Sequence, residues 1–206
     1  MDSRRLPLFP LPVVLFPENG MPLHIFEPRY REMVAGIMDG DRRFGFIYHD
    51  PDESGPFLNR EGQVGTVAEI RKHQPLPDGR SMLVVRGLER FVIRNEVENG
   101  TLYYQADVEE YGDESPASPE KLVQRRERCL GLFRSMLQAL PHVPDALPEL
   151  RADKEVSFPL AGVVQMEPFW QQELLEMRDE VARLERLEPI FRVRLERLWE
   201  GGGPEA

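Results

Sequence analysis

The sequence predicts an α+β protein, with antiparallel β-structure in its first half and helices in its second half. Three observations predict this order. Between residues 44 and 111, apolar residues alternate with a period of two, which is typical of half-buried strands. Dipeptides that favour tight turns, Asp78-Gly79 and Asn99-Gly100, separate these runs. Beyond the polar stretch GDESPASP (112–119), the apolar period changes to that of helices.

The expected strands are joined in sequence order by short turns, so we predict an antiparallel meander. Gly87 interrupts the third of them and suits a β-bulge or a sharp bend. The strands are FGFIYH (44–49), VGTVAEIRKH (64–73), SMLVVRGLERFVIR (81–94) and TLYYQADVEEY (101–111).

A helix is expected near residues 28–39, because Tyr30, Met33, Val34, Ile37 and Met38 recur at helical spacing. Pro28 suits its first position, and Gly40 suits its C-terminal cap. The turn before this helix gathers charged and titratable side chains, namely His24, Glu27 and Arg29. Because neither a nucleophile nor a metal partner stands nearby in sequence, we interpret this corner as structural, with Glu27 and Arg29 as a pair.

The second half is expected to form a helical bundle. Apolar residues at helical spacing from Leu122 to Leu140 include Cys129, which we interpret as a small buried hydrophobe rather than a reactive thiol. A short helix is expected within 153–166, and a long amphipathic one over 169–199 that Pro189 kinks or splits. Two i,i+4 pairs are expected on the wet face of that helix, Asp179 with Arg183 and Glu188 with Arg192.

These patterns divide the chain into residues 1–113, which hold the β-structure, a linker at 114–119, the helical part at 120–200 and a disordered tail at 201–206. The formal net charge is −10, and residues 1–119 carry 13 basic against 20 acidic residues. A nucleic-acid-binding protein normally needs a basic face, so this charge does not favour nucleic acid as the partner.

The remaining composition indicates a soluble, cytoplasmic protein that does not associate with a membrane. One cysteine excludes an internal disulfide and fits a reducing compartment. No apolar run is long enough to cross a bilayer, and four prolines break the apolar N-terminal stretch that superficially resembles a signal peptide.

Motifs for cofactor and metal chemistry are scarce. No glycine is followed by lysine, so a Walker A loop is impossible, and the four histidines are too scattered to predict a zinc site. One weaker pattern is DPDESGPFLNRE (50–61), which places Asp50, Asp52, Ser54, Gly55 and Glu61 as in a calcium-binding loop. Because strands are expected on both sides and prolines constrain this loop, we interpret it as a solvated acidic loop.

A family resemblance rests on LPLFPLPVVLFPENGMPLHIFEPRYREMV (6–34) and on two later stretches, VGTVAEI (64–70) and LPDGRSMLVVRGLERFVI (76–93). These motifs resemble the LON substrate-binding domain, the N-terminal domain of the ATP-dependent protease Lon (peptidase S16). The loop at residues 16–20 is two residues longer than in that family. The resemblance implies a PUA-like β-barrel followed by a helical bundle. It also implies a stand-alone bacterial relative without the ATPase and protease domains, and hence no enzymatic activity.

The function that the resemblance implies is non-catalytic binding of proteins or peptides, including unfolded segments, without a cofactor. Such binding needs accessible apolar surface. The candidates are apolar residues outside the periodic core stripes: Phe16, Met21, Met166, Phe169 and Trp170. The alternative for these residues is that they pack the two parts of the chain together. An alternative function is RNA binding through the PUA-like barrel, against which the charge of the first half argues.

Overall fold

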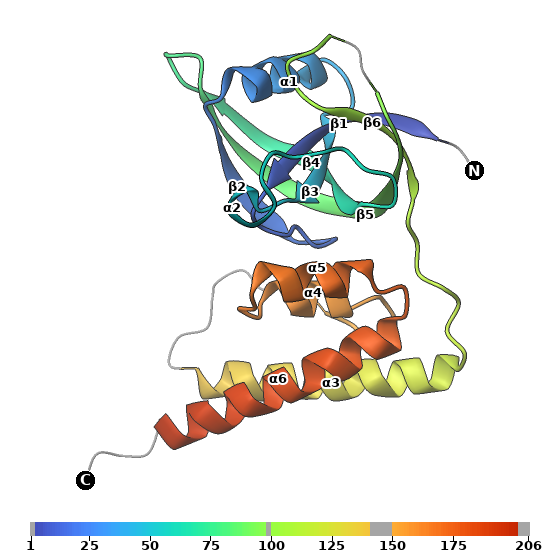
Figure 1. Cartoon of the computed structure of the whole chain (residues 1–206). Coiled ribbons are helices and arrows are strands. Elements are labelled where there is room, and N and C mark those ends of the chain that lie inside the picture. Colours follow the sequence, from blue (N-terminus) through green and yellow to red (C-terminus); the bar gives the residue numbers. More distant parts are fainter. Residues whose placement is uncertain (1–2, 98–99, 141–149, 202–206) are drawn as a thin grey trace. The chain divides into compact units, whose positions relative to one another are not determined.

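The computed structural model describes residues 3–97, 100–140 and 150–201, and the chain forms two units (Figure 1). The first unit comprises Met1–Gly112 with Gln165–Glu176, and the second comprises Asp113–Val164 with Met177–Ala206. The first boundary therefore lies close to the expected end of the β-structure at residue 113. Residues 165–176, which the sequence assigned to the helical part, group with the first unit instead.

A six-stranded sheet forms the first unit, and the mixed α+β class is confirmed. The strand order is β2-β5-β4-β3-β1-β6, and β6 also pairs with β5. Strands β5, β4, β3, β1 and β6 therefore each pair with the next, and β6 pairs with β5, so these five strands form a closed circuit. The strands are β1 (Arg4–Leu11), β2 (Gly20–Ile25), β3 (Arg43–Tyr48), β4 (Val64–Pro75), β5 (Ser81–Glu96) and β6 (Gln105–Glu110).

The meander from β3 to β6 is antiparallel as expected, but β1 and β3 pair in parallel, through residues 8–11 and 45–48. The other pairings of the sheet are antiparallel, so the sheet is mostly antiparallel, as expected. The reason for the parallel pair is the long connection between β1 and β3, which contains β2 and the first helix and lets β3 enter the sheet in the same direction as β1.

The turn between β4 and β5 forms where Asp78-Gly79 predicted it. Gly79 has a φ of 81°, in the left-handed region that favours glycine, and the Asp78 carboxylate accepts a hydrogen bond from the Arg80 N–H at 3.0 Å. The second turn dipeptide includes Asn99, which lies outside the described residues. Further along β5, the pairing with β4 shifts register opposite Gly87, as its interruption of the strand predicted.

Helix α1 (Pro28–Met38) begins with Pro28 in its first turn, as the sequence predicted. Its residues Tyr30, Met33 and Val34 are buried against the sheet, in a core that includes Phe9 and Phe44. The short helix α2 (Pro51–Ser54) follows β3. The apolar face of α1 therefore packs into the core of the first unit.

Helix α5 (Pro168–Glu176) belongs to the first unit because it is bonded to the sheet. The Gln172 Nε2 donates to the Val64 carbonyl at 3.0 Å, and the Arg90 guanidinium donates to the Leu175 carbonyl at 2.6 Å. The helix expected over 169–199 is thus interrupted at residues 177–179. Asp179 starts the next helix, since its carboxylate accepts from the Val181 N–H at 2.8 Å.

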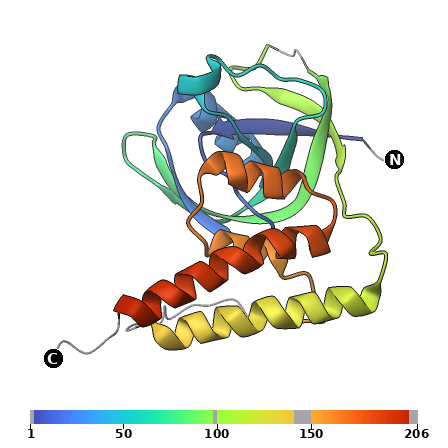
Figure 2. The ribbon, with the colours of Figure 1, turned by 60° about the horizontal axis from the view of Figure 1, so that its bottom comes forward.

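The second unit contains α3 (Pro119–Ala139), α4 (Ser157–Gly162) and α6 (Glu180–Gly201). Helices α3 and α6 lie side by side (Figure 2), with the rings of Phe133 and Phe191 6.1 Å apart. Helix α6 continues through Pro189, so the expected split does not occur there. The tail expected from residue 201 falls mostly outside the described residues.

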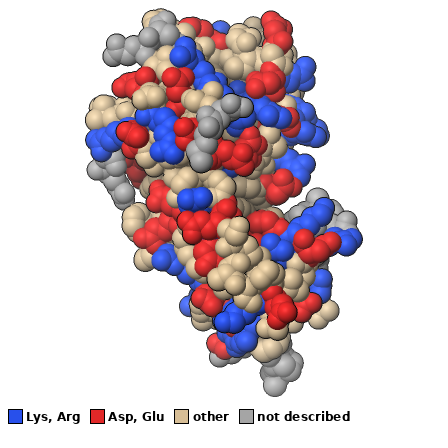
Figure 3. Space-filling model, turned by 90° about the vertical axis from the view of Figure 1, so that its right-hand side faces the viewer, with Lys and Arg blue, Asp and Glu red and all other residues tan. Residues whose placement is uncertain are grey.

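Charged side chains of both signs are interspersed on the face that Figure 3 shows. The predicted pair of Glu188 and Arg192 forms, at 2.8 Å. The prediction for Arg183 is wrong, since its side chain is 1% exposed and binds Asp113, which is 70 residues away. Over the part of the chain that the structure describes, no helix is both long and apolar enough to span a membrane.

Candidate functional site

Metal chemistry finds no support in the described residues, where no group of three or more His, Cys, Asp or Glu side chains could hold an ion. In the loop that resembles a calcium site, the Asp50 carboxylate accepts a hydrogen bond from the Asp52 N–H at 2.9 Å. This bond caps helix α2. Asp50 therefore has a local structural role in this conformation.

The thiol of Cys129 is buried in the second unit, as expected, and lies 3.6 Å from the Leu184 carbonyl oxygen. Burial raises the pKa of this thiol to about 11. We expect native protein at pH 8 to react very slowly with Ellman's reagent, because only about one thiol in a thousand would be ionised. Unfolding in guanidinium chloride should release one reactive thiol. Rapid reaction of the native protein would contradict this assignment.

The charged corner before α1 forms the expected pair. The Arg29 guanidinium lies 2.8 Å from a Glu27 carboxylate oxygen and 4.6 Å above the Tyr30 ring. Both charged side chains are more than a third exposed, so the pair contributes at most about 1 kcal/mol to stability. The corner thus has neither a nucleophile nor a buried, strongly coupled charge.

Beside this corner lies an apolar hollow of about 210 Å³. Tyr30 forms one wall; the residue is 3% exposed, and burial raises the pKa of its hydroxyl to about 12. Phe26 is 57% exposed, with its ring 5.6 Å from the ring of His24. The hollow is lined by Phe9, Leu11, Pro22, Leu23, Phe26 and Tyr30, together with His24 and Glu27. It is an accessible apolar depression formed by β1, β2 and the start of α1.

The five apolar residues that the sequence nominated do not share one surface. Phe16 is 2% exposed, and Met21 is partly buried against the core of the first unit. Met166 is partly buried, whereas Phe169 and Trp170 are 56% and 54% exposed. Phe169 and Trp170 are therefore accessible to a binding partner, and Phe16 is not.

Phe169 and Trp170 lie in the first turn of α5, with their rings 5.5 Å apart in an edge-to-face arrangement. Leu174 and Leu175 of the same helix are 3% and 2% exposed, so α5 buries one face and leaves the aromatic pair outside. The bonds from Gln172 and Arg90 fix the helix in this orientation. The exposure of the pair is therefore set by anchored neighbours.

A second group of exposed apolar residues was missed by the sequence reasoning. Met82 and Val84 of β5 are 39% and 40% exposed, and they lie opposite His24 and Pro22 of β2. The period of two was present in the sequence, since Met82 and Val84 alternate with Leu83 and Val85, which are the buried pair in the structure. The continuous apolar run from Met82 to Val85 hid which of its two faces was the core face.

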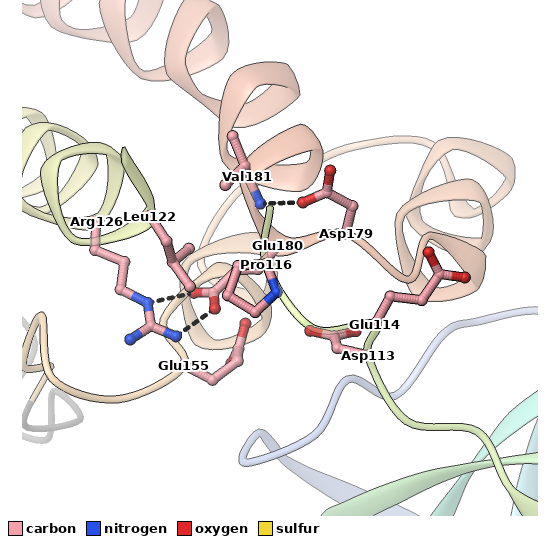
Figure 4. A pocket seen from close by; sticks show the side chains of 9 residues that line it. All are labelled: Asp113, Glu114, Pro116, Leu122, Arg126, Glu155, Asp179, Glu180 and Val181. Carbon is pink, nitrogen blue, oxygen red and sulfur yellow. Dashed lines mark hydrogen bonds and ion pairs between the residues drawn. The ribbon is translucent and has the colours of Figure 1, made fainter. Parts of the chain in front are cut away.

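An acidic hollow of about 190 Å³ lies in the second unit (Figure 4). The Arg126 guanidinium binds both Glu180 oxygens, at 2.9 and 2.5 Å, and the Val156 N–H donates to one of them at 3.1 Å. Burial and the nearby Glu180 raise the pKa of Glu155 above its usual range. Hydrogen bonds within the unit thus account for the buried charges of this hollow, which we interpret as structural.

The first unit therefore presents accessible apolar groups on an anchored α+β scaffold, a combination typical of a recognition domain. Residues 5–192 match the family described as ATP-dependent protease La (LON) substrate-binding domain. The chain belongs to this family.

Its relatives include Lon proteases of known sequence. The chain is 27% identical to that of Cytophaga hutchinsonii over 86% of this chain and 23% of that protein. It is 30% identical to that of Paraburkholderia phytofirmans over 88% of this chain and 23% of that protein. The chain thus spans about a quarter of the length of these relatives.

Two solved structures have a similar fold. A Lon N-terminal domain protein from Xanthomonas campestris superimposes with a TM-score of 0.65 and 24% identity, covering 89% of this chain and 96% of that one. The N-terminal domain of the Mycobacterium avium complex Lon protease gives a TM-score of 0.66 at 16% identity, covering 92% and 98%.

Proposed function

We propose that this chain recognises proteins or peptides, including unfolded segments, and performs no catalysis itself. Membership of a substrate-binding family supports recognition, and the observation that carries the proposal is the exposed pair of Phe169 and Trp170. Aromatic anchors of this kind commonly dominate the affinity of a protein interface. The PUA-like barrel and the helical bundle belong to the same proposal, and the closed circuit of strand pairing supports the barrel.

Phe169 and Trp170 suit this role because the fold does not depend on their side chains. Phe169 and Trp170 are 56% and 54% exposed, so burying the exposed part against a partner would remove roughly 80–140 Å² per side chain from water. The anchors of α5 are instead Leu174, Leu175 and the Gln172 amide. Substitutions of Phe169 and Trp170 should therefore weaken binding without lowering the stability of the fold.

The test is the double variant Phe169→Ser/Trp170→Ser. The probe is fluorescein-labelled lactalbumin, reduced and carboxymethylated so that it stays unfolded, with binding followed by fluorescence anisotropy. We expect affinity to fall at least about tenfold, because each buried aromatic contributes on the order of 1–2 kcal/mol. The melting temperature should change little, because the substitutions leave the core intact.

A matched control is Trp199→Ser, which removes a tryptophan that is 64% exposed on α6 of the second unit. This variant should bind the probe as the parent does. If the parent binds unfolded lactalbumin and the double variant binds it equally well, the pair on α5 is not the recognition surface. If the parent binds no unfolded probe, the proposed function itself is wrong.

A further inference from the structure

The β2 strand has one unpaired edge. Within the described residues β2 pairs with β5 alone and stands first in the strand order. An edge strand presents main-chain N–H and C=O groups that can pair with another extended chain. Proteins commonly cover or charge such edges, but Gly20–Ile25 carries no formal charge.

The register shows which groups face outward. The Gly87 N–H donates to the Asn19 carbonyl at 2.9 Å, so the next pair, Gly20 with Arg86, is a non-hydrogen-bonded pair. By alternation, Pro22 with Val84 and His24 with Met82 are also non-hydrogen-bonded pairs. The main-chain groups of Gly20, Pro22 and His24 therefore point away from β5. Pro22 fits this position, since its missing N–H removes no bond to β5.

The surroundings of this edge are apolar. The hollow beside the corner includes Pro22, Leu23 and His24 in its lining, so it borders the unpaired edge directly. On the outer face, the exposed Met82 and Val84 lie across from His24 and Pro22, where non-hydrogen-bonded pairing brings side chains close. A strand added to β2 would place alternate side chains over these two apolar regions.

The charged side chains near β2 indicate what kind of segment could bind there. Two ionic pairs lie near this edge, Glu18 with Arg86 and Glu27 with Arg29. An incoming segment would thus meet neither an unpaired cation nor an unpaired anion among these four groups. Such a surface complements an uncharged, apolar segment, because a charged one would lose hydration without gaining an opposite charge.

We infer that β2 binds an extended, uncharged, apolar segment of another polypeptide, which adds to the sheet as a strand beside Pro22 and His24. This inference rests on the proposed function, since it specifies the conformation of the bound segment. A second copy of this chain is a poorer occupant. Two β2 strands paired about Pro22 would bring together two residues without N–H donors, and the outward Pro22 carbonyls would face no donor there.

The test on the protein compares His24→Pro with His24→Ala. Both variants remove the imidazole, but only the proline removes the outward N–H, and neither removes a hydrogen bond to β5. The probe is the blocked, uncharged peptide acetyl-Thr-Val-Ala-Phe-Ala-Val-Thr-amide with a fluorescent label, in which every position between the two terminal threonines is apolar. We expect His24→Pro to bind it about tenfold more weakly than His24→Ala does, with similar melting temperatures. Equal affinities would overturn the inference.

The test on the peptide uses N-methylation of alternate residues. In an added strand only every second N–H faces β2, so one alternate set of N-methyl groups should abolish binding and the other should leave it within a few-fold. Equal effects of the two sets would overturn strand addition. If His24→Pro instead dissociates a dimer seen by light scattering, the occupant is a second copy and the inference is wrong. If the parent binds unfolded lactalbumin but not this peptide, the inference fails while the proposed function stands.

Discussion

Replacing Arg183 with methionine is expected to destabilise the second unit by about 3–5 kcal/mol, the cost typical of breaking a buried charged network. The Arg183 side chain is 1% exposed, and its guanidinium donates to the Asp113 carboxylate at 2.7 and 2.5 Å. It also donates to the Ser157 hydroxyl at 2.7 Å and to the Met177 carbonyl at 2.8 Å. Methionine fills much of the volume but cannot form any of these hydrogen bonds.

The measurement is urea unfolding followed by the helical circular dichroism signal, with Arg192→Met as the matched control. Arg192 is 47% exposed and pairs only with Glu188 among the interactions described for it, so its loss should cost about 0.5 kcal/mol or less. Arg183→Lys should fall between the two, because lysine keeps the charge but not the planar fork. If Arg183→Met is as stable as Arg192→Met, the network does not hold the unit together.

Arg183 also shows where sequence reasoning fails. Its spacing from Asp179 suggested an exposed i,i+4 pair, yet its partner Asp113 is 70 residues away. Periodicity reports on neighbours along a helix and cannot identify such a distant partner. The same limit explains the helix expected over 169–199. The break at residues 177–179 contains neither glycine nor proline, and only the capping carboxylate of Asp179 marked it.

The parts predicted well are those that local chemistry determines. The Asp78-Gly79 turn and the alternation of apolar residues located β3, β4, β5 and β6, and the Pro28 start located α1. The pairings of β1 and β2 join segments distant in sequence, so no local pattern specified them. For the candidate site, the packing of neighbouring residues determines which of the nominated apolar side chains are exposed. Phe16 and Trp170 both lie outside the periodic core stripes of the sequence, but only Phe16 is buried.

The second large effect is expected for Gly87→Ala in β5. A Cβ atom added at this position would lie 2.2 Å from the Phe16 carbonyl oxygen and 2.9 Å from its carbonyl carbon. These are backbone atoms, and they cannot move freely because the same loop is bonded to Gly87. The Glu18 N–H donates to the Gly87 carbonyl at 2.9 Å, and the Gly87 N–H donates to the Asn19 carbonyl at 2.9 Å. Overpacking against a fixed backbone costs about 1–3 kcal/mol or more.

The matched control is Gly131→Ala in helix α3, where an added Cβ would meet no atom within 4 Å. This change should stabilise the protein by up to about 1 kcal/mol, because alanine favours a helix interior more than glycine does. Thermal unfolding of both variants measures the contrast. Because the loop held by Gly87 leads into β2, Gly87→Ala should also weaken binding of the extended peptide, even at temperatures where the variant stays folded. A Gly87→Ala protein with parental stability and peptide affinity would show that the loop can shift without disturbing the unpaired edge.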